Sequence, residues 1–261
     1  MKEHDTFRAA RMIEIQKQGA DERFAQVSNE WMLHSYPHKY SYHFEWLGRP
    51  IIQYPQDTVA LQEICWQIRP DLIIETGIAH GGSMALSASM LMACDFADAY
   101  ERRQPLDTQE PKRKVLGIDV EFRQHNREAL DAHPLRPYMT IIEGSSVDAN
   151  VIREVRDVAD RHRNVLVLLD SNHSHNHVLA ELNAYAPLVT PGSYCIVYDT
   201  VIEDMPRGSF PDRNWDVGSN PKTAVQEFLG NNEDFSVDQT IEDKLQITVA
   251  PQGYLKRRKV M

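Results

Sequence analysis

From about residue 57 onward, short runs of β-branched and apolar residues alternate with segments of ten or more residues that have helical spacing. This alternation is typical of parallel strands joined by crossover helices. Several of the runs are apolar without interruption, as in Leu72–Ile74 and Val165–Leu169, which is expected where helices cover both faces of a sheet. We therefore predict a doubly wound, Rossmann-like α/β sheet.

The predicted strands are Asp71–Glu75, Val115–Asp119, Met139–Glu143, Val165–Asp170 and Ser193–Asp199. Helical spacing occurs in Ser83–Ala99, Asn126–Ala132, Asn150–Arg161, Asn176–Tyr185 and Pro221–Leu229. The polar stretch Glu203–Asn220 contains Pro and Gly and is a candidate lid. After it, Phe235–Asp238 and Leu245–Val249 are predicted as two closing strands, joined by a charged turn at Gln239–Lys244.

The chain has 261 residues, of which 42% are apolar, and this is enough for one large core. We predict one catalytic domain over residues 57–261, preceded by a helical and aromatic N-terminal extension over residues 1–56. The extension contains the aromatic stretch Trp31–Trp46, whose rings either stack on a substrate sugar or belong to the core or a subunit interface. Because exposed apolar patches usually mark contacts, we expect a homo-oligomer.

The net charge of −10 argues against a protein that neutralises nucleic-acid phosphates and favours small-molecule chemistry. We predict that the basic run Lys256–Lys259 is a solvated tail. The three cysteines are far apart in apolar stretches, so we predict buried thiols and no disulfide framework. No run reaches the length of a membrane span, and no leader segment is evident, so we expect a cytoplasmic protein.

The strongest local motif is Ile73–Ser83, an apolar strand that ends in Glu75 and leads through a glycine-rich turn into a helix. Glycines such as Gly77 and Gly81 let the backbone approach a ligand closely at the carboxyl end of a strand, where open α/β sheets bind their ligands. The spacing differs from the dinucleotide G-x-G-x-x-G pattern, and no lysine follows as in a phosphate-binding loop. We predict a nucleotide-like cofactor here; the alternative is a tight turn without a ligand.

Two further strand ends extend this predicted cofactor site. Asp119 ends the second strand, where an acid can accept hydrogen bonds from both ribose hydroxyls of an adenosine. The third strand leads into Glu143–Asp148, which contains Ser145. Its small residues and terminal acid either frame an adenine edge or cap the following helix.

Asp170 and Asp199 end the fourth and fifth predicted strands, so two carboxylates are expected to emerge on the cofactor side. Carboxylates, completed by water and substrate oxygens, suit Mg²⁺. His173 follows Asp170 by three residues and is a candidate general base. The alternatives are that the acids are a helix cap and a turn residue, or that His173, His175 and His177 bind zinc, although the chain offers few other zinc ligands.

At these residues the chain resembles the cephalosporin hydroxylase family of methyltransferases, which includes rhamnosyl O-methyltransferases. The resemblance runs through most of the chain, from Tyr40–Gln53 through Glu75–Ser83 and Leu168–His175 to Pro251–Lys256. It implies a class I methyltransferase sheet, S-adenosylmethionine over the Glu75–Ser83 motif and Asp119, and Mg²⁺ near the two strand-end acids.

Some relatives are expected to carry a second acid beside Asp199, but here Tyr198 precedes it and Thr200 follows it. The third metal ligand is therefore open, with Thr200, an acid of the Glu203–Asp204 pair, or water as candidates. The Asp-x-x-His segment also resembles metal-dependent macrolide-sugar O-methyltransferases, in which a histidine at that offset is the presumed base. For this chain, that base is His173.

Together these features predict an S-adenosylmethionine- and Mg²⁺-dependent O-methyltransferase that acts on a hydroxyl of a sugar or a sugar-bearing small molecule. We assign the metal to Asp170 and Asp199 and the proton to His173. The cofactor residues are Glu75, Gly77, Gly81, Ser83, Asp119 and Ser145. Of these, Glu75 either contacts the methionine amino group or braces the glycine turn. The rival interpretations are a dinucleotide-dependent oxidoreductase and a non-catalytic nucleotide-binding subunit of a biosynthetic complex.

Overall fold

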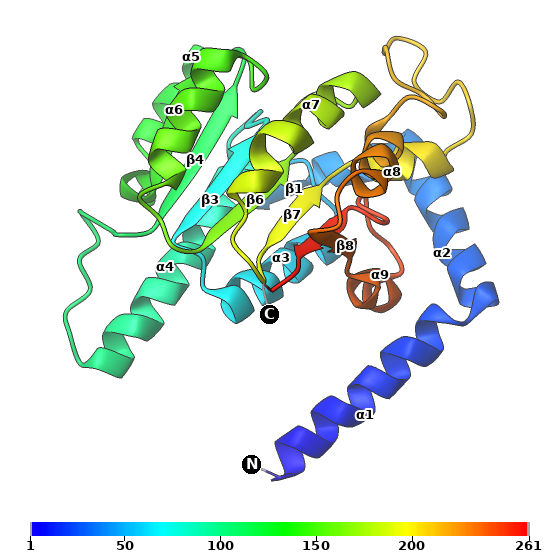
Figure 1. Ribbon diagram of the computed structural model, residues 1–261, viewed down its shortest axis with the longest axis horizontal. Coiled ribbons are helices and arrows are strands. Elements are labelled where there is room, and N and C mark those ends of the chain that lie inside the picture. The colour runs from blue at the N-terminus through cyan, green and yellow to red at the C-terminus, as the bar shows by residue number, and fades with distance from the viewer. Residues whose placement is uncertain (1, 260–261) are drawn as a thin grey trace.

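The computed structural model describes residues 2–259, with side chains described from residue 5 onward. In this part of the chain, seven strands form one sheet in the order β5-β4-β3-β6-β7-β9-β8 (Figure 1). The first five in this order are parallel: β5 (Met139–Glu143), β4 (Lys114–Asp119), β3 (Leu72–Thr76), β6 (Val165–Leu169) and β7 (Tyr194–Val197). The chain order reverses on either side of β3, so the predicted doubly wound sheet is confirmed.

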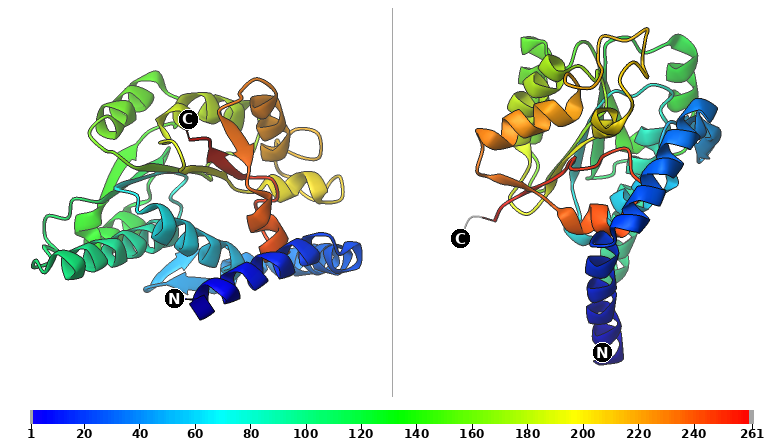
Figure 2. Two further views of the ribbon diagram at one scale, coloured as in Figure 1. Left: turned by 60° about the horizontal axis from the view of Figure 1, so that its bottom comes forward. Right: turned by 90° about the vertical axis from the view of Figure 1, so that its right-hand side faces the viewer.

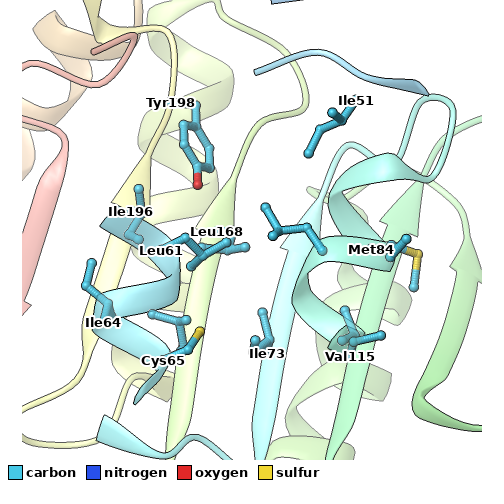
Figure 3. Close-up of a cluster of buried hydrophobic side chains, with 14 of the residues drawn as sticks. Ile51, Leu61, Ile64, Cys65, Ile73, Met84, Val115, Leu168, Ile196 and Tyr198 are labelled. Carbon is cyan, nitrogen blue, oxygen red and sulfur yellow. The ribbon is translucent and has the colours of Figure 1, made fainter. Parts of the chain in front are cut away.

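Helices cover both faces of the sheet. One face carries α3 (Pro55–Ile68) and α4 (Gly82–Arg102), and the other carries α6 (Ala149–Ala159), α7 (His175–Tyr185) and α8 (Pro221–Gly230). The buried strands alternate between the two resulting cores: Ile73 packs with the α3 side, while Leu72 and Ile74 pack with the α7 side. Figure 3 shows the first core, where Leu61, Ile64 and Cys65 of α3 lie against the strands.

The remaining segments of the sheet region are short. Helix α5 (Gln124–Asp131) follows β4, and 3₁₀ turns lie at η3 (Arg136–Tyr138), η4 (Ala186–Leu188) and η5 (Thr200–Asp204). All three cysteines are buried and free, as predicted. Among the described residues, no helix is both long enough and apolar enough to cross a membrane.

The segment before residue 55 lies on the face of the sheet that carries α3 and α4, and its last part contacts α4. It comprises α1 (Lys2–Gly19), which projects away from the sheet (Figure 2), α2 (Glu22–Ser35), and the 3₁₀ turns η1 (Tyr36–His38) and η2 (Tyr40–His43). These lead into a two-stranded hairpin, β1 (Phe44–Trp46) and β2 (Arg49–Ile51). The hairpin docks on α4 so closely that a Cβ atom on Gly82 would lie 2.2 Å from the Pro50 carbonyl oxygen.

The secondary structure predicted for the end of the domain is partly wrong. Phe235–Val237 forms β8, as expected, but the next residues form helix α9 (Gln239–Leu245) in place of a turn, and Leu245–Val249 is not a strand. Ile241 and Leu245 are four residues apart, which places both on the side of α9 that packs against the α3 core. The last strand is β9 (Tyr254–Arg257), which lies between β7 and β8 and runs antiparallel to both.

The basic run at the end of the chain is therefore not simply a solvated tail. Lys256 and Arg257 belong to β9, and Arg257 donates hydrogen bonds to the carbonyl oxygens of Pro187 and Val189. The Lys256 ammonium group lies 5.1 Å from the centre of the Tyr194 ring. Both head groups thus contact neighbouring parts of the chain.

Candidate active site

A cavity of about 590 Å³ opens at the carboxyl ends of β3, β4, β5, β6 and β7. This is the edge where open α/β sheets bind their ligands. Of the predicted site residues, seven line this cavity: Gly77, Ser83, Asp119, Ser145, Asp170, His173 and Asp199. Glu75 and Gly81 do not line it: Glu75 is buried in β3, and Gly81 directly precedes α4 with a φ of +84°.

The turn after β3 is shaped by glycine. Gly77 has a φ of +86°, and a Cβ atom there would lie 2.0 Å from the Asp170 carbonyl oxygen, so only glycine fits between β3 and β6. The turn then directs the backbone N–H groups of Ile78 and Ala79 to the Asp119 Oδ2 atom, at 2.9 and 3.1 Å. Asp119 thus fixes the glycine turn, and its carboxylate keeps acceptor capacity for a ligand.

Glu75 lies beneath the turn and is 1% exposed. Its carboxyl group accepts hydrogen bonds from the hydroxyl groups of Ser83 and Ser87 on α4. Burial raises the pKa of Glu75 to about 7, against the lowering effect of these two hydrogen bonds. These hydrogen bonds tie β3 to the start of α4, as the bracing role requires, and the contact with the methionine amino group stays a prediction.

The adenine side of the predicted cofactor site lies after β5. Ser145 and Ser146 line the cavity beside Asp119. Asp148 instead caps α6, accepting hydrogen bonds from the backbone N–H groups of Asn150 and Val151. The small residues after β5 thus face the cavity, while the acid at the end of that segment has the capping role.

Three groups converge where β6 and β7 end. One ligand atom each from Asp170, His173 and Asp199 can be chosen so that all three lie within 4.8 Å of one another. The His173 Nε2 atom is 3.3 Å from the Asp199 Oδ2 atom. Asp199 itself has a φ of +56°, a left-handed conformation that is unusual for a non-glycine residue and often marks functional positions.

The electrostatics of this cluster fit a divalent cation. Burial, followed by the negative charges of Asp199 and Glu75, raises the pKa of Asp170 well above its ordinary value. Among the described residues, no Lys or Arg forms an ion pair with Asp170 or Asp199. Two neighbouring carboxylates without a cationic side chain are the donor set that Mg²⁺ binds with oxygen ligands.

None of the protein groups predicted as third ligand lies in this cluster. The Thr200 hydroxyl donates to the Pro251 carbonyl oxygen, Glu203 accepts from Gly218 and Asn220, and Asp204 pairs with Lys222. Tyr198 points into the α3 core, next to Leu61 and Leu168 (Figure 3).

A polar residue that the sequence pattern does not indicate lies beside the cluster. Gln53, which follows β2, is 6% exposed and lines the cavity. Its Nε2 atom donates to the Asp170 Oδ2 atom at 3.2 Å, while its Oε1 atom is buried without a hydrogen-bond partner. No spacing rule links residue 53 to residue 170, so the sequence alone contains no signal for this contact.

Of the three alternating histidines, His173 alone belongs to the cluster, and the zinc interpretation therefore finds no support in the described residues. His175 contacts Thr223 and Glu227 on α8. His177 lines the cavity, with its Nε2 atom 3.1 Å from the Ser146 and Ser171 hydroxyl oxygens.

Aromatic rings from two distant segments surround the outer part of the cavity. Tyr36 of η1 and Phe210 of the candidate lid meet edge to face, with ring centres 5.1 Å apart. The Trp215 ring packs edge to face on His173, with centres 4.9 Å apart, and the Arg213 guanidinium lies 5.2 Å from the Trp215 ring centre. The residues before position 57 thus supply part of the cavity wall.

Solved structures share this fold. A structure of CmcI with Mg and SAM matches with a TM-score of 0.53 and 17% identity, over 83% of this chain and 77% of that one. The MycE methyltransferase from the mycinamycin biosynthetic pathway, in complex with Mg, SAH and mycinamycin VI, matches with a TM-score of 0.50 and 14% identity. That match covers 87% of this chain and 54% of MycE. The fold is that of the class I methyltransferases.

Sequence comparison is more specific. The profile of the rhamnosyl O-methyltransferase/CmcI family matches residues 38–258. A rhamnosyl O-methyltransferase of Mycobacterium bovis is 30% identical over 199 residues, which cover 75% of this chain and 71% of the relative. The chain therefore belongs to the rhamnosyl O-methyltransferase/CmcI family, as the sequence motifs indicated.

Proposed function

We propose that this chain is an S-adenosylmethionine-dependent O-methyltransferase, assisted by Mg²⁺, that acts on a hydroxyl group of a sugar or glycosylated small molecule. The observation that carries the proposal is the convergence of Asp170, His173 and Asp199 in the cavity that begins at the glycine turn. A cofactor site and a hydroxyl-activating site thus share one space. The names of the mycobacterial relatives and the ligands of the CmcI and MycE structures support the same chemistry.

Residues in different parts of the cavity have different proposed roles. Gly77, Ser83, Asp119 and Ser145 line the cavity. Gly77 and Ser83 would contact the methionine part of the cofactor, Asp119 would accept hydrogen bonds from the ribose hydroxyls, and Ser145 would lie at the adenine edge. Asp170 and Asp199 would hold the cation, which would lower the pKa of a substrate hydroxyl and orient it. His173 then accepts the hydroxyl proton at its imidazole. Positioning of the substrate oxygen against the sulfonium methyl group would supply much of the rate.

The outer cavity is suited to a ring-bearing acceptor. Tyr36, Tyr42, Phe210 and Trp215 line the cavity there. Aromatic faces pack well against sugar rings and apolar aglycones. We infer that residues 57–261 form the catalytic domain and that the segment 1–56 completes its acceptor side.

We also retain the proposals of a homo-oligomer and of a cytoplasmic location. In the stretch Trp31–Trp46, Trp31 and Phe44 pack against Tyr40 within the chain, so these rings do not by themselves require a partner. Exposed apolar side chains lie instead on the projecting helix α1, at Phe7 and Ile13. Light scattering at micromolar concentration tests the proposed homo-oligomer, and a clean monomer would contradict that proposal.

Calorimetry with S-adenosylhomocysteine and with NAD separates the proposed enzyme from an oxidoreductase. We expect binding of S-adenosylhomocysteine and no comparable binding of NAD, because the glycine turn lacks the spacing for a pyrophosphate. Asp119→Ala should weaken the binding, since it removes both the ribose acceptor and the group that fixes the turn. Tight NAD binding without S-adenosylhomocysteine binding would overturn the proposal.

A further inference from the structure

Gln53 occupies an unusual position for a buried amide. It lies in the cavity wall and is 6% exposed, its Nε2 atom contacts Asp170, and its Oε1 atom has no hydrogen-bond partner. An unpaired buried acceptor typically costs about 1–3 kcal/mol, so such an atom calls for an explanation, such as a ligand that it meets only when the site is filled.

We propose that Gln53 is the third protein ligand of the divalent cation, binding it through Oε1 beside Asp170 and Asp199; this inference rests on the proposed function. The amide needs only to turn by 180° about its terminal bond, which exchanges the Oε1 and Nε2 positions. The turn gives up a single donor contact to Asp170, and the Nε2 group takes the place that the oxygen leaves.

The spacing of the two side chains fits this role. Mg²⁺ binds oxygens at about 2.1 Å in near-octahedral geometry, so adjacent ligand atoms lie about 3.0 Å apart. The Gln53 amide position that faces Asp170 is 3.2 Å from the Asp170 Oδ2 atom. An amide oxygen placed there would therefore lie at the distance of a neighbouring ligand.

The backbone around Gln53 is anchored on both sides. Before it, Arg49 donates to the His80 carbonyl oxygen at 3.0 and 2.5 Å, and Pro50 lies against Gly82. After it, the Tyr54 hydroxyl lies 2.7 Å from the Ser35 hydroxyl oxygen. The segment before residue 57 thus presents this side chain to the strand ends with little freedom, as a metal ligand requires.

The alternatives for the third position are less suitable. Thr200, Glu203 and Asp204 are engaged elsewhere, and His173 is needed as a base. The neutral amide also explains how the site works with Tyr198 in place of a second acid. A carbonyl oxygen is a normal ligand for Mg²⁺, and it adds no further negative charge to a cavity that already holds two carboxylates.

The test uses Mn²⁺ as a spectroscopic substitute for Mg²⁺, with the full chain and no substrate. Metal affinity is measured by electron paramagnetic resonance, and the number of metal-bound waters by water-proton relaxation. For Gln53→Leu, we expect an affinity loss of roughly tenfold or more, together with one additional water on the metal. For Gln53→Glu, we expect affinity at least equal to that of the wild type.

The matched control is Gln56→Leu, which removes another amide with a buried, partnerless Oε1 atom, on α3 and away from the cavity lining. It should leave both readouts unchanged. S-adenosylhomocysteine affinity and thermal unfolding verify that each variant is folded, and Gln53→Asn replaces Gln53→Leu if the latter is not.

Unchanged Mn²⁺ affinity in Gln53→Leu, or weaker affinity without an additional water, would overturn the ligand role and leave the proposed function intact. A wild-type protein that binds no Mn²⁺ would overturn both.

Discussion

The His173 Nε2 atom lies 3.3 Å from the Asp199 Oδ2 atom, so the loop after β6 and the end of β7 meet at a histidine–carboxylate contact. The same imidazole is packed on another side by the Trp215 ring of the candidate lid. A base held by a carboxylate and an aromatic ring has a defined orientation before substrate arrives. This is the arrangement from which we expect proton transfer to proceed.

Replacement of His173 with Ala should lower kcat by roughly 10²–10⁴-fold, the usual contribution of a positioned general base. Because Asp170 and Asp199 remain, metal affinity should be nearly unchanged, and raising the pH should restore part of the rate. Steady-state kinetics and Mn²⁺ binding measure the two effects. His175→Ala is the control, since His175 contacts α8 and does not line the cavity. Full activity of His173→Ala would exclude the base role.

Asp170→Asn and Asp199→Asn should each weaken metal binding and reduce turnover. Affinity for S-adenosylhomocysteine should change little, because the proposed adenosine contacts lie at the ends of β3, β4 and β5. Isothermal calorimetry with each ligand separates the two effects. Asp204→Asn is a suitable control, because Asp204 pairs with Lys222 outside the cavity lining. Parallel losses of metal and cofactor affinity would show that the two sites are not independent.

The parallel core of the fold was predictable because buried parallel strands have a distinct composition. The runs around Ile73 and Val167 are apolar throughout, and each is followed by a turn or loop residue at the cofactor edge. The strand-end acids Asp119, Asp170 and Asp199 were predictable for the same reason, since parallel strands end at one edge.

The end of the chain was less predictable because its pattern is weak. Residues 239–245 are mostly polar, and their helix is recognisable only through the burial of Ile241 and the docking of α1, whose Gln18 donates to the Asp243 carbonyl oxygen. Lys256 and Arg257 lie in β9, which their basic composition did not indicate because this strand is held by pairing with β7 and β8. Gln53 illustrates the same limit, because its contact with Asp170 joins residues 117 positions apart.

Gly77→Ala should destabilise the protein and impair cofactor binding. The substitution combines a positive φ with a Cβ atom placed 2.0 Å from the Asp170 backbone, so we expect a loss of about 3 kcal/mol or more in the free energy of unfolding. Gly48→Ala is the matched control: its φ is also positive, but its Cβ atom would meet nothing within 4 Å. Denaturant unfolding of both variants isolates the clash. Equal losses of stability in the two variants would show that the positive φ, and not the clash, causes the destabilisation.

Asp57 predicts a pH dependence of stability. It is buried under hydrogen bonds from Thr248, Tyr254 and the Val249 backbone, and burial raises its pKa from 3.8 to about 6. The folded state therefore binds the proton more tightly than the unfolded state, so stability from this group is complete below pH 3.8 and is lost as the pH rises through about 6.

The corresponding measurement compares wild type with Asp57→Asn, which has no such titration. Between pH 4 and 6.5, the free energy of unfolding of the wild type should fall relative to that of the variant. The full pKa shift corresponds to a fall of about 3 kcal/mol. Denaturant unfolding at several pH values gives this difference directly. A difference that stays constant with pH, or rises with it, would show that the Asp57 carboxyl is not perturbed in this direction.

The most direct test of the account is transfer of a labelled methyl group from S-adenosylmethionine to a panel of rhamnosides and other deoxysugar glycosides, with and without a chelator. We predict that a sugar hydroxyl becomes labelled, that chelation of divalent metal abolishes the labelling, and that added Mg²⁺ restores it. Labelling that proceeds at the full rate in the presence of chelator would contradict the account, because Asp170 and Asp199 would then have no metal-binding role in the reaction.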